Sequence, residues 1–502
     1  MALQKLTLSL AAVAAMATGA FADAYGTGLA DAFSKGKVDG QVRGMYDYQN
    51  NQVFGNQPNN NNSGFALGGN LGYTTAPYYG IQAGAKFYTT QVLGASSNLN
   101  GGVNNKGQNI PQASLAPFVE NASSTAGTTP QSYSVLGEAF VQGTYGKTIA
   151  KIGRQTLDTP LAGGDDNYMI PNLFQAGVLI NQDIPQTTLV AAYVNGMMGG
   201  TTGDSHASQS LFTGTTYGSG NAQTGFNSMS RSALGQIVGL PTNLSNGASI
   251  GNQPVIALAA VNSSIPFTTA QLWYYNNTDV LNALYFSADI AGEVAKDWKP
   301  SLSGQWYNLA AQGKTKTLLT NVGNAFPGAV NNLSYSVWGV KGGLSTPIGL
   351  TPEVAGNFVQ GKNSTAFVFN AWGGVPNYTD MAFVNISNFA GYAGGLLGGN
   401  SVSARGLNVF KASLTQDLKQ YNLGDRNIQV AFGSYDFSKS NNNGNNVDTS
   451  VWDVVYNCKG ALVKNLDMKI FWENVKYNSA WQNVGGTNKS TNYVFARAIY
   501  GF

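Results

Sequence analysis

The residues best suited to chemistry lie in one stretch, "GRQTLDTPLAGGDDNYMIPN", residues 153–172. It places an arginine, three aspartates and paired glycines in a chain of 502 residues of which only 10% are charged. Paired aspartates could bind a divalent cation or form a catalytic acid cluster. The stretch therefore raises the question of whether this protein is an enzyme, a metal-binding protein or something else.

The rest of the sequence argues against catalysis. His206 is the only histidine and Cys458 the only cysteine, so a histidine metal cluster, a Cys/His zinc site and an internal disulfide are all excluded. The complete phosphate-cradling pattern, G-x-x-x-x-G-K-[S/T], is also missing. We therefore expect neither an enzyme nor a resident metal or cofactor.

The amino terminus predicts export. "MALQK" supplies one positive charge, a short apolar run follows, and "AFA" at residues 20–22 places small residues where a signal peptidase cleaves. The apolar run is shorter than the ~20 residues that a membrane-spanning helix needs. We predict a signal peptide over residues 1–22, cleaved before Asp23.

The composition is unusual for a water-soluble protein. Charged residues make up 10% of the chain, well below the about 25% of soluble domains, while Gly reaches 63 and Tyr and Phe are 25 and 24. The 27 basic and 24 acidic residues nearly balance, which gives no indication of a nucleic-acid partner. Something other than a charged, water-facing surface must solvate this protein.

Apolar and polar residues alternate with period two, which is the pattern of β-strands. In "KVDGQVRGMYDYQ", residues 37–49, one face is apolar and aromatic and the other is polar but sparsely charged. Segments of this kind predict eighteen strands, at residues 37–50, 63–75, 78–91, 132–146, 147–154, 173–182, 186–197, 253–263, 266–277, 279–291, 297–311, 333–345, 348–361, 404–417, 425–438, 447–460, 463–477 and 490–502.

The connections between these segments are of two kinds. Some are short, such as "TYGKT", whereas residues 92–131, 199–252 and 361–403 form long loops. Short turns at one rim and long loops at the other are typical of an outer-membrane β-barrel. A membrane protein built of strands must close, because lipid satisfies no backbone hydrogen bonds. We predict an all-β, closed antiparallel transmembrane barrel over residues 37–502, preceded by a short segment, residues 23–36.

Two further features support a barrel. The chain ends in "YVFARAIYGF", and a last strand that ends in Phe502 resembles the signal by which outer-membrane barrels are recognised for assembly. The segments "AFVFNAWGG" and "NFAGYAGGLLGG" make residues 361–403 too apolar for a solvated loop. We expect this loop to pack into the barrel or against a neighbouring subunit.

The sequence resembles two groups of porins. "GRQTLDTPLAGGDDNYMIPNLFQ", residues 153–175, together with the strand "TTLVAAYV", is similar to OprD-type outer-membrane porins. "GLADAFSKGKVDGQVRGMYDY" and "QLWYYNNTDVLNALYFSADI" look more like the Campylobacter-type major outer-membrane porins. The resemblance implies an eighteen-stranded barrel, a homotrimer, and a loop folded inward to constrict the pore.

The resemblance also implies positions for the charges. Arg154 would lie on the wall where its strand ends, with Asp158, Asp165 and Asp166 on the constricting loop. The alternative for Arg154 and Asp158 is that they pair with each other and fix the loop. The strand pattern directs further charges into the lumen and makes them candidates for the pore lining: Arg43, Lys86, Glu138, Lys151, Lys469, Glu473 and Arg497.

These observations predict an outer-membrane porin of a Gram-negative bacterium, in which ions and small hydrophilic solutes diffuse passively through a water-filled channel. Its partners would be outer-membrane lipid, those solutes and two further copies of the chain. Because no dense arginine run occurs, a general diffusion pore is favoured over a channel dedicated to anions. The alternative is a surface adhesin or structural outer-membrane protein whose long loops bind a partner.

Overall fold

The computed structural model describes most of the chain. The described residues are 28–50, 61–95, 102–103, 109–110, 119–123, 127–164, 168–199, 226–230, 233, 250–325, 331–361, 371–374, 376–384, 386, 405–437, 447–480 and 489–502. The predicted signal peptide lies outside them, as do Asp165, Asp166 and much of the three long loops.

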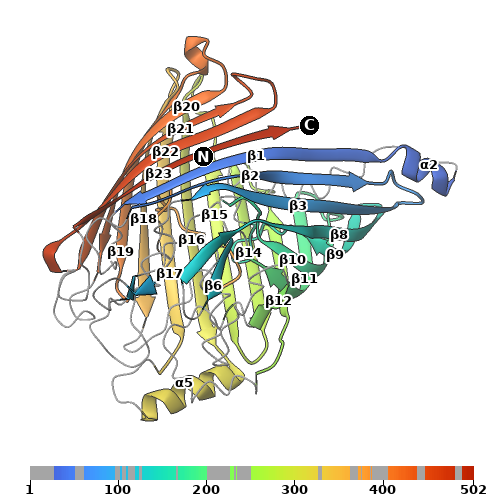
Figure 1. The fold of residues 1–502 in the computed structure, drawn as a ribbon, viewed down its shortest axis with the longest axis horizontal. Coiled ribbons are helices and arrows are strands. Elements are labelled where there is room, and N and C mark those ends of the chain that lie inside the picture. Colours follow the sequence, from blue (N-terminus) through green and yellow to red (C-terminus); the bar gives the residue numbers. More distant parts are fainter. Residues whose placement is uncertain are drawn as a thin grey trace.

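Eighteen antiparallel strands form one closed sheet, because β1 pairs with both β2 and the last strand, β23. In Figure 1 β1, in blue, lies beside β23, in red. The barrel strands are β1 (Lys37–Asn50), β2 (Asn61–Thr74), β3 (Ile81–Ala95), β8 (Tyr133–Tyr145), β9 (Thr148–Gln155), β10 (Leu173–Asn181), β11 (Thr187–Met198), β13 (Val255–Asn262), β14 (Thr268–Asn277), β15 (Leu281–Ala291), β16 (Lys299–Ala311), β17 (Ser334–Ser345), β18 (Leu350–Gly361), β19 (Asn408–Asp417), β20 (Arg426–Asp436), β21 (Asp448–Lys459), β22 (Leu466–Tyr477) and β23 (Ser490–Gly501).

The smaller elements lie at the rims and in the loops. A short helix precedes β1, and a longer helix lies in the connection from β16 to β17 (Figure 1). These elements are α2 (Leu29–Ser34), β4 (Gly102–Val103), β5 (Asn109–Ile110), β6 (Val119–Ser123), β7 (Gly127–Gln131), β12 (Asn227–Ser228), α5 (Gly313–Ala325) and η3 (Lys419–Tyr421).

The predicted fold class is confirmed, since each of the eighteen predicted segments overlaps one barrel strand. Strand β1 shows why alternation was informative. Val38 and Val42 are exposed on the outer face, whereas Arg43, Met45 and Asp47 are buried on the inner face. A period of two therefore separates lipid-facing from lumen-facing residues.

The outer face carries a continuous apolar belt. Every barrel strand exposes at least one large apolar side chain, here taken in strand order: Val42, Leu67, Phe87, Val141, Ile152, Leu179, Leu189, Leu258, Leu272, Phe286, Leu302, Trp338, Val354, Phe410, Val430, Trp452, Trp472 and Tyr500. An exposed apolar surface that encircles a molecule requires an apolar solvent. Among the residues that the structure describes, no helix is long and apolar enough to cross a bilayer.

The connections alternate in length, as predicted. At one rim the turns are short, and that between β8 and β9 contains only residues 146 and 147. Gly146 has φ 56°, which suits the first position of a type II′ hairpin turn. At the other rim are long connections, three of which concern the site: loop L3 (residues 156–172), loop L4 (residues 199–254) and loop L7 (residues 362–407).

Candidate pore constriction

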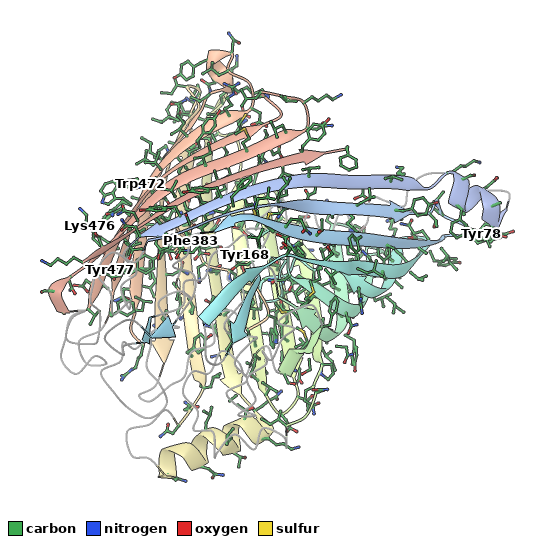
Figure 2. The ribbon with its side chains drawn as sticks, in the orientation of Figure 1. Tyr78, Tyr168, Phe383, Trp472, Lys476 and Tyr477 are labelled. Carbon is green, nitrogen blue, oxygen red and sulfur yellow. The ribbon has the colours of Figure 1, made fainter. Side chains whose placement is uncertain are left out.

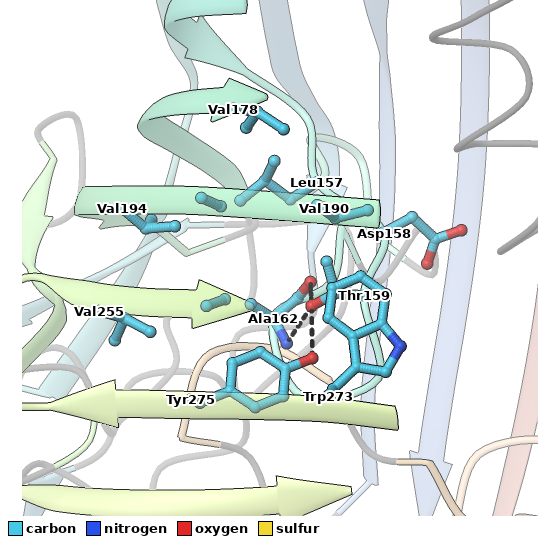
Figure 3. Close-up of a pocket in the computed structure, with 12 residues that line it drawn as sticks. Leu157, Asp158, Thr159, Ala162, Val178, Val190, Val194, Val255, Trp273 and Tyr275 are labelled. Carbon is cyan, nitrogen blue, oxygen red and sulfur yellow. Dashed lines mark hydrogen bonds between the residues drawn. The ribbon is translucent and has the colours of Figure 1, made fainter. Parts of the chain in front are cut away.

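Loop L3 leaves the wall after β9 and reaches the inner face of β14. The Tyr275 hydroxyl on β14 donates to the Thr159 hydroxyl at 3.1 Å and accepts the Leu161 backbone N–H at 3.4 Å. Leu157 and Leu161 are each only 4% exposed because they cover this wall. Figure 3 shows the small apolar cavity that remains behind the loop, lined mainly by side chains of β10, β11, β13 and β14.

The other end of L3 meets the opposite part of the ring. The Arg43 guanidinium on β1 donates to the Tyr168 backbone carbonyl, and Arg43 is only 2% exposed. Met169 is buried in a cluster with Met45 of β1 and Phe495 of β23. Since L3 touches β14 at one end and β1 at the other, the loop crosses the lumen, as the resemblance implied.

Loop L7 enters the lumen from the opposite side. Its backbone is held by two buried carboxylates on neighbouring strands. Glu473, which is fully buried, accepts the N–H groups of Phe383 at 2.9 Å and Val384 at 3.1 Å. Asp453, cross-strand from Glu473, accepts the Ala382 N–H at 2.8 Å. Each of these three backbone N–H groups has its acceptor in one of the two side chains, so residues 382–384 are fixed to the wall.

Further polar groups hold the preceding part of L7. The Asn357 side-chain oxygen on β18 accepts the N–H groups of Tyr378 at 2.9 Å and Thr379 at 3.1 Å. The Lys411 ammonium on β19 donates to the Asp380 carbonyl at 2.5 Å. This confirms that part of residues 361–403 packs into the barrel; "NFAGYAGGLLGG" lies outside the described residues.

A charged group lies on the wall next to L7. Cross-strand pairing sets Asp289, Ser303 and Lys341 side by side on β15, β16 and β17. The Lys341 ammonium lies 3.9 Å from a Glu353 carboxylate oxygen and 5.0 Å from the Tyr378 ring centroid. Burial raises the pKa of Tyr378 above its ordinary value, so its hydroxyl stays neutral and adds no charge.

Three of the sequence-predicted lining residues lie together near the turn rim. Lys86 of β3 pairs with Asp39 of β1, and its cross-strand neighbour Glu138 accepts the Tyr88 hydroxyl at 2.7 Å. The Lys151 ammonium lies 3.9 Å above the Phe140 ring centroid. Whether these side chains line the conducting path stays a prediction.

Two predicted basic residues are direct neighbours. Lys469 of β22 and Arg497 of β23 are cross-strand partners, and both are partly exposed. The Lys469 ammonium lies 5.3 Å from the Phe471 ring centroid. Adjacent positive charges at one level of the wall attract anions. Their contribution to the pore also stays a prediction.

Arg154 and Asp158 have different surroundings. Arg154 has the strand parity of Ile152, which is 68% exposed on the outer face. Its guanidinium donates to the Leu136 carbonyl at 3.1 Å and lies 4.7 Å from the Phe226 ring. Neither contact involves Asp158, so the pairing of Arg154 with Asp158 stays a prediction, as does the place of Arg154 on the pore wall. Asp158 is exposed at the edge of the L3 cavity, and Asp165 and Asp166 lie outside the described residues.

Sequence reasoning named Glu473 but missed the other residues that hold L7. Asp453, Lys411 and Lys341 have the same inward parity as Glu473, so extending the strand reading to every charge would have found them. Asn357 and Trp372 carry no comparable signal, because their partners lie far away in the sequence.

Comparison with known proteins gives the fold. No protein-family model and no curated protein matches the chain. Solved structures are similar along nearly its whole length. Pseudomonas aeruginosa OccK8 (OprE) has a TM-score of 0.62 at 12% identity, covering 94% of this chain and 98% of that one. P. aeruginosa OccK9 (OpdG) has a TM-score of 0.62 at 12% identity. P. aeruginosa OpdK, solved with vanillate, has a TM-score of 0.59 at 12% identity. Each of these two similarities covers 94% of this chain and 99% of the other. The chain therefore has the barrel fold of OprD-type porins.

Proposed function

We propose that this protein is an outer-membrane porin of a Gram-negative bacterium. The observation that carries the proposal is the contrast between its two faces. The outside is apolar around the whole ring, whereas two loops fold into the lumen and are held there by buried polar and charged side chains. A barrel that served only as an anchor would not need eighteen strands and a built constriction.

The channel works by passive diffusion. Water fills the lumen, and the width and charge of the constriction decide which solutes pass. The charges of inward strand parity include both signs, and some of them form ion pairs, such as Lys341 with Glu353 and Lys86 with Asp39. Such pairs weaken the field of each charge. We therefore propose a general pore for ions and small hydrophilic solutes rather than a channel for one anionic substrate.

The test is conductance in a planar lipid bilayer. Refolded protein that shows heat-modifiable migration on a gel should give stable open steps with a linear current at low voltage. The same preparation after boiling, which unfolds the barrel, should give none. A folded sample without conductance would contradict the proposal.

We also propose that three copies assemble and that the chain is closer to the Campylobacter-type porins than to the carboxylate channels. The support is the resemblance in sequence and the apolar belt, which can pack against other copies as well as lipid. Cross-linking in native membranes should stop at a species of three chains. A ladder that stops at one chain would refute the trimer and leave the porin proposal unaffected.

A further inference from the structure

Loops L3 and L7 are joined directly inside the barrel. They leave the wall on opposite sides, L3 between β9 and β10 and L7 between β18 and β19. The Gly163 N–H donates to the Trp372 carbonyl at 3.2 Å, and the Gly374 N–H donates to the Leu161 carbonyl at 3.2 Å. Ala162 thus forms two isolated β-bridges with L7, one to Trp372 and one to Gly373.

The two backbones approach too closely for side chains. Gly373 has φ 85°, and a Cβ there would lie 2.3 Å from the Asn172 side-chain nitrogen. A Cβ on Gly374 would lie 2.4 Å from the Pro160 carbonyl oxygen. Backbone atoms cannot move aside without moving the loop. The contact, which we call the L3–L7 junction (residues 160–163 with 372–374), therefore depends on these glycines.

Trp372 connects the junction to its surroundings. Its side chain is fully buried, and its indole N–H donates to the Met229 carbonyl of L4 at 3.2 Å. Its ring lies 5.9 Å from that of Tyr275 at an interplanar angle of 29°. Because the Tyr275 hydroxyl also bonds Thr159 of L3, this one indole links three loops to the wall at β14.

Both loops reach the same apolar cluster at the far side of the lumen. Tyr168 of L3 and Phe383 of L7, both labelled in Figure 2, pack against the cluster that includes Met45, Phe471 and Phe495. Phe383 also stacks on Tyr493 of β23 at 4.6 Å between ring centroids. L3 and L7 are therefore attached to each other, or to the same cluster, at both ends of their path.

We propose that L3 and L7 act as one partition, whose position is set by the L3–L7 junction. This inference rests on the proposed porin function. Attachment at two points removes the freedom of the loops to move relative to each other. Trp372 and Gly374 are then positioning residues for the pore. They lie inside the partition and do not touch the solute, but they fix the width of the channel beside it. A pore with a rigid partition has a single conductance and low current noise.

The experiment compares three variants by single-channel recording. Gly374→Val inserts a side chain into the junction and separates the loops. Trp372→Phe keeps a ring and removes the indole N–H. Gly304→Val is the matched control, because a Cβ at Gly304, in strand β16, meets nothing within 4 Å. Heat-modifiable migration shows whether each barrel has folded.

Gly374→Val should raise the conductance at least ~1.5-fold, increase open-channel noise, and admit larger neutral polymers, since the partition no longer has one position. Trp372→Phe should give a smaller change in the same direction, and it serves as the decisive variant if Gly374→Val does not fold. Gly304→Val should equal the wild type. Wild-type conductance and noise in the folded junction variants would overturn the inference, whereas a silent wild type would overturn the porin proposal instead.

Discussion

The two constriction loops are held by different kinds of contact. At its β14 end L3 rests on an apolar wall, where Val178, Val194 and Trp273 line a cavity together with Leu157 of the loop (Figure 3). L7 is held through its backbone by polar side chains, chiefly Glu473 and Asn357. Apolar contact is non-directional and tolerates small shifts, whereas buried hydrogen bonds require one geometry. We therefore expect L7 to be the more sensitive of the two loops to single substitutions.

The largest effect is expected for Glu473→Ala. It leaves the buried N–H groups of Phe383 and Val384 without their acceptor, which should lower the free energy of unfolding by about 3 kcal/mol. L7 should leave the wall and conductance should rise. Urea unfolding and bilayer recording measure the two results. The control is Asp467→Ala, which removes an exposed carboxylate on the same strand and face. Equal stability and conductance of the two variants would show that Glu473 does not hold L7.

A graded pair of substitutions tests the same wall further along L7. Asn357→Leu removes the acceptor for the Tyr378 and Thr379 N–H groups and should cost about 2 kcal/mol. Thr379→Val removes only the hydroxyl that donates to Asn357 and should cost about 1 kcal/mol. Urea unfolding of both variants shows which of them loses more free energy of unfolding. If Thr379→Val were the more damaging, the backbone contacts would not be what holds the loop.

On the L3 side, Tyr275→Phe removes the one hydroxyl that bonds both Thr159 and Leu161. The expected loss of stability is about 1 kcal/mol, with conductance unchanged, because the leucines of L3 remain buried against the wall. Conductance is recorded for Tyr275→Phe and Asn357→Leu under the same conditions, so that the L3 and L7 variants can be compared directly. A conductance change in Tyr275→Phe as large as in the L7 variants would show that L3 too depends on directional bonds.

The barrel was predictable because its signal is local. Inward Arg43 and outward Val42 differ by one position, so a period of two separates lumen from lipid without knowledge of any partner. The constriction was only partly predictable. Parity placed Glu473 in the lumen, but the N–H groups that it binds lie about 90 residues away, and the indole of Trp372 reaches Met229 across 143 residues. Contacts at such separations leave no pattern in the sequence.

Arg154 shows the limit of transferring roles by resemblance. The motif placed it correctly at the end of a strand, yet its parity is outward and its guanidinium covers the Leu136 carbonyl. Pairing between β8 and β9 ends at Ala139 opposite Arg154, so the edge of β8 beyond this point has no strand partner in β9. A basic side chain at such an edge satisfies a carbonyl that would otherwise lack a donor. Only the register of β8 and β9 shows that the Leu136 carbonyl requires such a donor.

The smallest effect is expected from filling the cavity behind L3. Ala257 of β13 is 3% exposed and lines the cavity with Leu157 and Val190 (Figure 3). Ala257→Val adds two methyl groups to a cavity lined mainly by apolar side chains, so it should stabilise the barrel by up to about 1 kcal/mol. Ala259→Val, on the same strand and face but outside the cavity, is the control. Because an apolar wall can adjust to such a change, the urea midpoint should rise while the conductance stays constant. A fall in the midpoint would mean that the wall behind L3 tolerates substitution as poorly as the wall that binds L7.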